Sequence, residues 1–187
     1  DAPFEIGRVH AFTKGWLERE CNFLHMDYKY LLGLLKGGFY EDFYAEIPTN
    51  LVPFLDPNVY GRNPAEASSF IVPTCNPNQE NWGRGFFARL TGANAEFLNM
   101  LCLLFLGDKP FSLDNGTLKF SLQPKLSAEF FDEKGEASFL LFGKTKIIYH
   151  NPKRLDCYKG VNLLYSYSGK TASLIEGEDA LAIREGK

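Results

Sequence analysis

The sequence predicts an α+β protein in which a helical segment precedes an antiparallel β domain. In the first part of the chain, apolar residues recur every three to four positions, which is the period of one helix face. After about residue 108 they alternate with polar residues, which is the period of a strand. With 45% hydrophobic and 23% charged residues, a packed protein is expected. We therefore expect residues 1–108 to be helical and residues 109–187 to be β.

Two helices joined by a short turn are expected first. One is predicted over residues 16–36 and should end at Gly37 and Gly38, because glycine readily leaves helical geometry. A second should follow over residues 40–47 and stop at Pro48. So short a turn makes the pair an antiparallel hairpin over residues 15–47. The apolar face of the first helix comprises Leu17, Cys21, Leu24, Tyr28, Leu31 and Leu35.

Residues 53–89 follow neither period and contain five prolines, which predicts a long irregular loop. Its aromatic and apolar residues indicate that packing orders it. A helix is then predicted over residues 91–106. It is apolar on most sides, so we expect it to be buried, and Gly107 should close it.

The β domain is expected to be an antiparallel sandwich, because several short strands follow one another at even spacing. Residues 111–184 should be mostly strand, with no helix longer than two turns after residue 115. Hairpin turns are predicted at Asp114-Asn115-Gly116 and at Glu133-Lys134-Gly135. The expected strands cover residues 118–122, 137–142, 144–150 and 161–167.

The charge and the cysteines exclude several classes of function. A net charge of −3 provides no basic field for nucleic acid. The longest apolar run is too short to cross a membrane, so no membrane partner is expected. Cys21, Cys75, Cys102 and Cys157 are too scattered for a metal site or a disulfide framework, which indicates reduced thiols in a cytoplasmic protein. Because residue 1 is Asp and not Met, we expect the chain to be part of a longer one.

Three stretches carry a resemblance to a known family. They are Glu-Cys-Asn-Phe-Leu-His at residues 20–25 with Tyr-Lys-Tyr-Leu-Leu at 28–32, Gly-Phe-Phe-Ala-Arg-Leu-Thr-Gly-Ala-Asn-Ala at 85–95, and Gly-Thr-Leu at 116–118 with Leu-Gln-Pro-Lys-Leu at 122–126. In this order they resemble the C-terminal end of the cellobiose and chitobiose phosphorylases. Arg89 replaces the family's Trp and Leu126 replaces its second Pro, so a divergent branch is expected.

The resemblance implies both a fold and a reaction. Residues 1–108 would be the C-terminal helices of an (α/α)6 barrel, and residues 109–187 the C-terminal β-sandwich that follows it. The reaction would be inverting phosphorolysis of a β-linked glucoside or oligosaccharide to a sugar 1-phosphate. The catalytic acid would lie upstream, in the missing N-terminal part of the same protein. Inorganic phosphate would be the co-substrate, without metal or organic cofactor, and a homodimer is implied.

The same resemblance places the phosphate-binding side of the site at His25, Thr91 and Gly92. Imidazole can donate a hydrogen bond to phosphate, and the bare amides at a helix start attract anions. The structural alternatives are a helix-packing histidine and an ordinary Thr N-cap. We expect His25 and Thr91-Gly92 to converge on one polar cavity, with residues 53–89 forming part of its wall.

Six further residues are candidates for phosphate or sugar contacts. Arginine suits bidentate contacts, carboxylates accept from sugar hydroxyls, and tryptophan stacks on sugar rings. The structural alternatives are solvated loop arginines, helix-surface carboxylates and a buried loop anchor. These candidates are Arg84, Arg89, Glu18, Glu20, Glu66 and Trp82.

Two other functions remain open from the sequence. One is a glycoside hydrolase on an (α/α)6 barrel, in which water replaces phosphate. The other is a non-catalytic carbohydrate-binding or structural module. Since the catalytic acid is expected elsewhere, the isolated chain should have no phosphorolytic activity.

Overall fold

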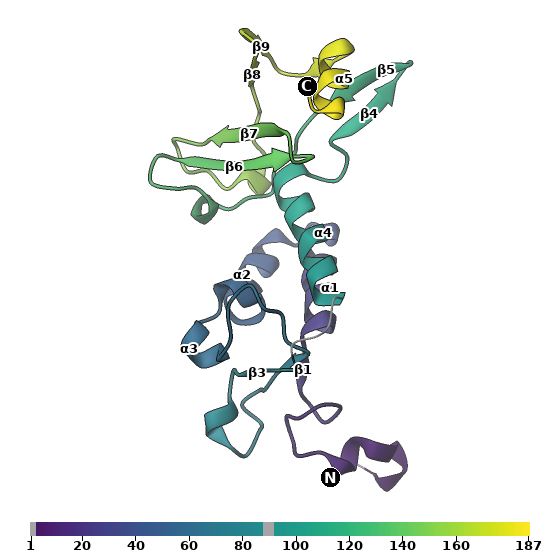
Figure 1. Ribbon diagram of the computed structural model, residues 1–187, viewed down its shortest axis with the longest axis vertical. Coiled ribbons are helices and arrows are strands. Elements are labelled where there is room, and N and C mark those ends of the chain that lie inside the picture. The colour runs from purple at the N-terminus through teal and green to yellow at the C-terminus, as the bar shows by residue number, and fades with distance from the viewer. Residues whose placement is uncertain (1–2, 88–91) are drawn as a thin grey trace. The chain divides into compact units, whose positions relative to one another are not determined.

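The computed structural model describes residues 3–87 and 92–187, except for the side chains of residues 4–6 (Figure 1). The protein is mixed α and β with small sheets. It divides into an N-terminal unit, Asp1–Met100, and a C-terminal unit, Leu101–Lys187. The boundary falls inside a helix, whereas the change in sequence pattern lies near residue 108. No described helix has the length and apolar character needed to span a membrane.

The N-terminal unit combines helices with one small sheet. Its elements are η1 (Phe4–Ala11), β1 (Asn22–Phe23), α1 (Leu24–Gly37), α2 (Tyr40–Asn50), η2 (Val52–Phe54), α3 (Pro57–Tyr60), β2 (Phe70–Ile71), η3 (Gln79–Asn81), β3 (Gly85–Phe86) and the start of α4 (Gly92–Leu106).

The predicted start of the first helix is wrong, because α1 begins at Leu24 and not near residue 16. Leu17 and Glu20 have φ angles of 46° and 61°, in the left-handed region, so a right-handed helix cannot pass through them. Phe23 instead pairs with Phe70 in the antiparallel sheet. The predicted end is correct. Gly38 adopts φ 79° and its N–H bonds to the Leu35 carbonyl.

Helix α2 also departs from the prediction, since it continues through Pro48 to Asn50. Pro48 lies in the last turn, where its missing N–H removes a single helical bond. The Leu51 N–H still bonds to the Ile47 carbonyl at 3.0 Å, which completes the helix end. α1 and α2 pack against each other. Their buried residues are Leu24, Tyr28, Leu31, Leu32, Leu35, Phe43 and Ile47.

Residues 53–87 are held by packing and by the sheet. The three strands lie in the order β1-β2-β3, all antiparallel. Phe70 is fully buried at the centre, and the Trp16 ring packs edge-on to it at 5.1 Å between centroids. Segments from residues 16, 23, 70 and 86 therefore form one aromatic cluster. This long-range cluster explains why residues 16–23 are extended and turned and not helical.

Helix α4 was expected to be buried on most sides, and this is wrong. Ala93, Met100 and Leu104 are buried, but the Leu98 side chain is 62% exposed and Cys102 is also exposed. A uniformly apolar sequence does not reveal which side faces the core. Only the positions of its neighbours decide that.

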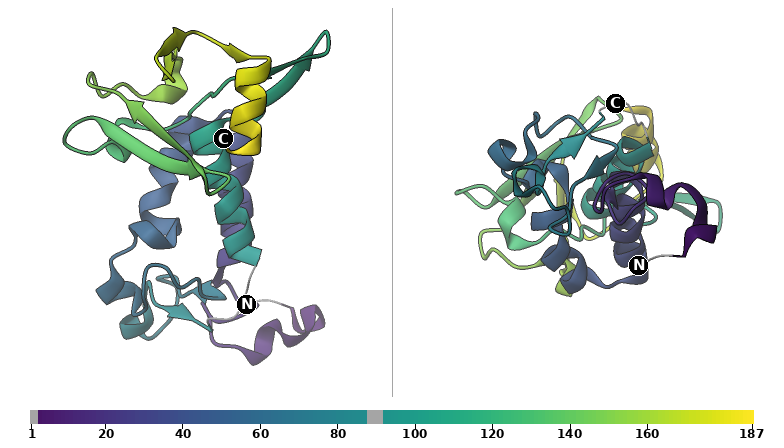
Figure 2. Two further views of the ribbon diagram at one scale, coloured as in Figure 1. Left: turned by 45° about the horizontal axis from the view of Figure 1, so that its top comes forward. Right: turned by 90° about the horizontal axis from the view of Figure 1, so that it is seen from below.

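The C-terminal unit contains three small antiparallel sheets and a short helix (Figure 2). Its elements are β4 (Phe111–Asp114), β5 (Thr117–Phe120), η4 (Ala128–Phe130), β6 (Glu136–Leu141), β7 (Thr145–His150), η5 (Cys157–Lys159), β8 (Tyr165–Tyr167), β9 (Lys170–Ala172), β10 (Ile175–Glu176) and α5 (Glu178–Glu185). The predicted turn at Asn115-Gly116 joins β4 to β5, with φ angles of 47° and 82°. The turn predicted at residues 133–135 instead leads into β6, and Phe142-Gly143 makes the β6–β7 hairpin.

The expectation that residues 111–184 are mostly strand is wrong. The strands are two to six residues long, with extended segments between them. α5 has eight residues, slightly more than two turns. Its residues favour a helix locally: Glu178 and Asp179 complement the dipole at its start, and Gly186 closes it in the left-handed conformation.

Candidate functional site

His25 and the start of α4 lie in direct contact. His25 is the second residue of α1, and its ring lies against Gly92, the first residue of α4. A Cβ atom at Gly92 would lie 2.6 Å from both Nδ1 and Cε1 of the His25 ring. Only glycine allows so close an approach. The structure therefore brings together two of the three residues predicted to bind phosphate.

A carboxylate that the sequence analysis missed lies near Nε2 of the ring. Glu96 Oε1 is 3.6 Å from His25 Nε2, which makes an ion pair when the imidazole is protonated. The Glu96 side chain is 17% exposed and that of His25 is 33% exposed. Because Glu96 follows Gly92 by four residues, both lie on the same face of α4. This spacing was the available signal, and it became meaningful only once His25 was known to face α4.

Two further phosphate candidates, Thr91 and Arg89, lie outside the described residues. The described part of the site therefore consists of His25 on α1 and of Gly92 and Glu96 on α4.

The other sequence candidates have partners elsewhere in the N-terminal unit. Glu18 pairs with Arg8, Glu20 with Lys14 at 3.3 Å, and Glu66 with Arg62 at 2.7 Å.

The Trp82 indole N–H donates to the Asn76 carbonyl at 2.8 Å, which makes Trp82 a loop anchor. The Arg84 guanidinium lies over Gly61, with Nε 3.3 Å from the position of a Cβ there.

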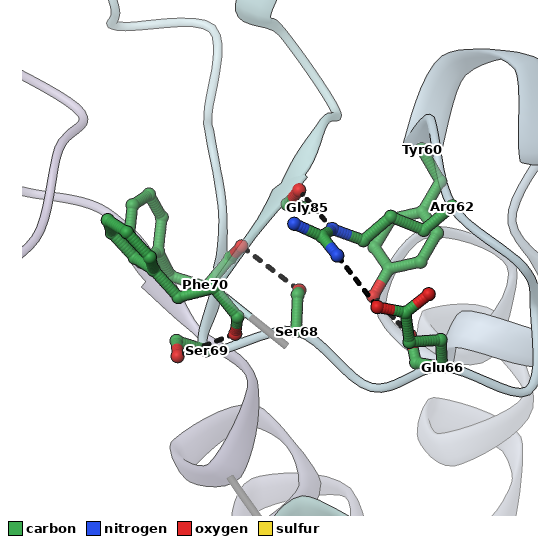
Figure 3. A network of polar contacts seen from close by, with 8 residues as sticks. Tyr60, Arg62, Glu66, Ser68, Ser69, Phe70 and Gly85 are labelled. Atoms are coloured by element: carbon green, nitrogen blue, oxygen red, sulfur yellow. Dashed lines mark hydrogen bonds and ion pairs between the residues drawn. The ribbon is translucent and has the colours of Figure 1, made fainter. Parts of the chain in front are cut away.

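Arg62 holds together the loop that leads to α4 (Figure 3). Its Nε donates to the Gly85 carbonyl at 2.7 Å, and its terminal nitrogen pairs with Glu66. The Tyr60 hydroxyl donates to the Glu66 carbonyl at 2.8 Å. A Cβ at Gly85 would meet the Tyr60 ring, so backbone and ring are in close contact. This network joins residues 60–66 to β3, and the sequence offered no signal for it.

A half-buried carboxyl, that of Asp27, was also missed from the sequence and lies in the first turn of α1. Burial raises the pKa of Asp27 to about 6, a hydrogen bond from Asn22 opposes the shift, and the charge of Glu46 adds to it. One carboxyl oxygen of Asp27 is buried without a hydrogen-bond partner among the described residues. Asn50 connects the two sides of this cluster, because its amide donates to Glu46 at 2.8 Å and its oxygen accepts from Asn22 at 3.4 Å.

Within the residues that the structure describes, no group of three or more His, Cys, Asp or Glu side chains is arranged to hold a metal ion. The groups near His25 are the Glu96 carboxylate and the start of α4. Comparison of the sequence with models of protein families and with curated proteins finds no match.

Proposed function

We propose that this chain is the C-terminal part of an inverting glycoside phosphorylase of the kind that the cellobiose and chitobiose phosphorylases represent. The observation that carries the proposal is the contact of the His25 ring with Gly92, at the first residue of α4. The N-terminal unit would complete an (α/α)6 barrel with helices from upstream sequence, and the C-terminal unit would be the β-sandwich. The protein would be cytoplasmic, with reduced cysteines, and homodimeric.

The two sides of the His25 ring would have different roles. Nε2 faces Glu96 at 3.6 Å, and this carboxylate would hold the ring in place. The Nδ1 side lies over the N-terminus of a 15-residue helix, whose dipole and free amides favour an anion. A phosphate bound there would receive a hydrogen bond from Nδ1–H as well as the field of the helix.

In the reaction, a phosphate oxygen attacks the anomeric carbon while the bond from that carbon to the glycosidic oxygen breaks. A carboxylic acid supplied by the upstream sequence protonates the departing oxygen. This chain's residues hold the attacking phosphate in line and offset its charge. Phosphate is a co-substrate, and no metal or organic cofactor is required.

The test is His25→Ala in the complete enzyme. A charge-assisted hydrogen bond contributes roughly 1.5–3 kcal/mol, so the KM for phosphate should rise about ten- to hundred-fold. The KM for the sugar should change little. His150→Ala is the matched control, because His150 also pairs with a carboxylate, Glu136 at 3.2 Å, but lies in the C-terminal unit. If His25→Ala changed the KM for phosphate and the KM for the sugar equally, His25 would be a helix-packing residue and would not bind phosphate.

Glu96 specifically favours a second candidate, a glycoside hydrolase. A carboxylate beside an imidazole can orient it as a base for water, and the same carboxylate repels a phosphate dianion. Glu96→Gln separates the two functions. In a hydrolase it should lower kcat for hydrolysis without any effect of added phosphate. In a phosphorylase its effect should fall mainly on the KM for phosphate.

A further inference from the structure

The N-terminal unit contains a cavity of about 590 Å³. This volume lies within the range of roughly 300–1,000 Å³ that is usual for small-molecule sites. His25 and Gly92 do not line it, so the convergence of these residues on this cavity is not observed. The cavity is lined by Glu20, Cys21, Asn22, Pro48, Thr49, Leu55, Ile71, Val72, Pro73, Thr74 and Gly83.

The walls of the cavity are held by backbone hydrogen bonds. The Val72 N–H donates to the Arg84 carbonyl at 3.0 Å, and the Gly83 N–H donates to the Val72 carbonyl at 2.8 Å. Pro48 and Thr49 belong to the last turn of α2. Backbone hydrogen bonds thus support one wall of the cavity and helix α2 supports another. The cavity is therefore preformed, and a ligand would not need to order its walls on binding.

The lining combines apolar walls with uncharged or compensated polar groups. Leu55, Pro48 and Pro73 provide most of the apolar surface, and Asn22, Thr49 and Thr74 provide an amide and two hydroxyls. Lys14, 3.3 Å from Glu20, offsets the charge of that carboxylate. Burial, followed by the charge of Glu18, raises the pKa of the Cys21 thiol to about 11, so it stays neutral near pH 7.

Among the described lining residues there is no Lys, Arg or His. An anion such as phosphate would therefore enter without a counter-charge, at a high desolvation cost. Because Lys14 offsets the charge of Glu20, the cavity also attracts a cation only weakly. A neutral ligand with many hydroxyls fits this lining best, because the carboxylate and the amide can bond to hydroxyls while the apolar wall covers carbon atoms.

We propose that this cavity binds a neutral sugar unit, with hydroxyls at Glu20, Asn22 and Thr49 and the ring face against Leu55 and Pro73. The choice of a sugar rests on the proposed function, whereas the position of the site rests on the cavity alone. Asn22 precedes His25 by three residues, so one short segment would present a sugar site and the phosphate site. The sugar unit bound here is distinct from the one that phosphate attacks.

The test uses the 187-residue chain labelled with ¹⁵N and two separate NMR titrations, one with cellobiose and one with inorganic phosphate. Cellobiose should shift the amide signals of Cys21, Thr49 and Val72. Phosphate should shift the signals of His25 and Gly92 and leave the cavity unchanged. The two titrations thus report separately on this inference and on the proposed function.

Two variants test the named contacts. Thr49→Val removes a hydroxyl and keeps the shape, and Glu20→Gln removes a charge. Each should weaken cellobiose binding about five- to ten-fold, the effect of one hydrogen bond. Thr117→Val and Glu80→Gln are matched exposed controls and should change nothing. The dispersion of each variant's spectrum shows whether it is folded.

Three results would overturn the inference. One is the absence of cellobiose shifts at the cavity up to roughly 50 mM, a concentration that would reveal even weak binding. Another is a set of cellobiose shifts confined to His25 and Gly92. The third is phosphate shifting the cavity amides. Absence of phosphate shifts at His25 and Gly92 would count against the proposed function and leave the cavity inference intact.

Discussion

At the scale of single residues, Asp27 couples stability to pH. Burial raises its pKa from an ordinary 3.8 to about 6, because the folded state disfavours the charged form. The folded state therefore holds this proton more tightly than the unfolded chain. The resulting stabilisation is fully present below pH 3.8 and is lost as the pH rises through about 6.

We predict that Asp27→Asn stabilises the protein above pH 6 and has little effect near pH 4. The amide carries no charge to desolvate, and it can still bond to Asn22. After allowing for solvent screening, the gain at pH 8 should be on the order of 1–2 kcal/mol. Thermal unfolding at pH 4 and pH 8 measures it, with the exposed Asp108→Asn as control. A variant less stable at pH 8 than the parent protein would contradict the shift.

A second prediction concerns the contact of Gly92 with His25. The methyl group of Gly92→Ala would lie 2.6 Å from the ring, so His25 must move from its place over α4. In the complete enzyme, this variant should raise the KM for phosphate about as much as His25→Ala does. When Gly92→Ala is added to His25→Ala, the KM for phosphate should rise little further, because the two residues act through one contact. Additive effects in this double-mutant cycle would separate Gly92 from His25.

At the scale of elements, two glycines predict opposite results. Gly33 lies inside α1 with open space where a Cβ would be, so Gly33→Ala should stabilise the protein by about 0.5–1 kcal/mol. Gly85 in β3 faces the Tyr60 ring, and a Cβ there would lie 2.8 Å from Ser68 Oγ. Gly85→Ala should destabilise the protein by about 1–3 kcal/mol through overpacking.

Urea unfolding of both glycine variants checks this pair. If Gly85→Ala were neutral, the network of Tyr60, Arg62 and Glu66 would not confine β3 as described. The same variant in the complete enzyme should also affect the phosphate site, because β3 precedes the start of α4 by a few residues.

At the scale of the whole molecule, the division of the activity between this chain and upstream sequence can be tested directly. We predict that the isolated chain, incubated with phosphate and a β-linked gluco-oligosaccharide, forms no sugar 1-phosphate. The reason is the expected absence of the catalytic acid. If activity appeared and Asp27→Asn abolished it, the acid would be Asp27, and the chain would hold a complete site.

The sequence by itself determined the features that depend on a few neighbouring residues. Gly38 ends α1 because glycine adopts a left-handed conformation there, and Asn115-Gly116 turns a hairpin for the same reason. The change from a helical to a strand period correctly predicted a mixed α and β protein. The resemblance to the cellobiose and chitobiose phosphorylases pointed to His25 and Gly92, which the structure places in contact.

Only the tertiary structure decided where α1 starts, which side of α4 is buried and what surrounds His25. Phe23 pairs with Phe70, so a residue distant in sequence overrides the local helical pattern. Arg62 bonds to Gly85 within a stretch that shows no period at all. Glu96 became a site residue only because α1 brings His25 to the same face of α4. Likewise, the shifted pKa of Asp27 arises from burial and from Glu46 on another helix. Such effects depend on distances in space, which a local pattern does not contain.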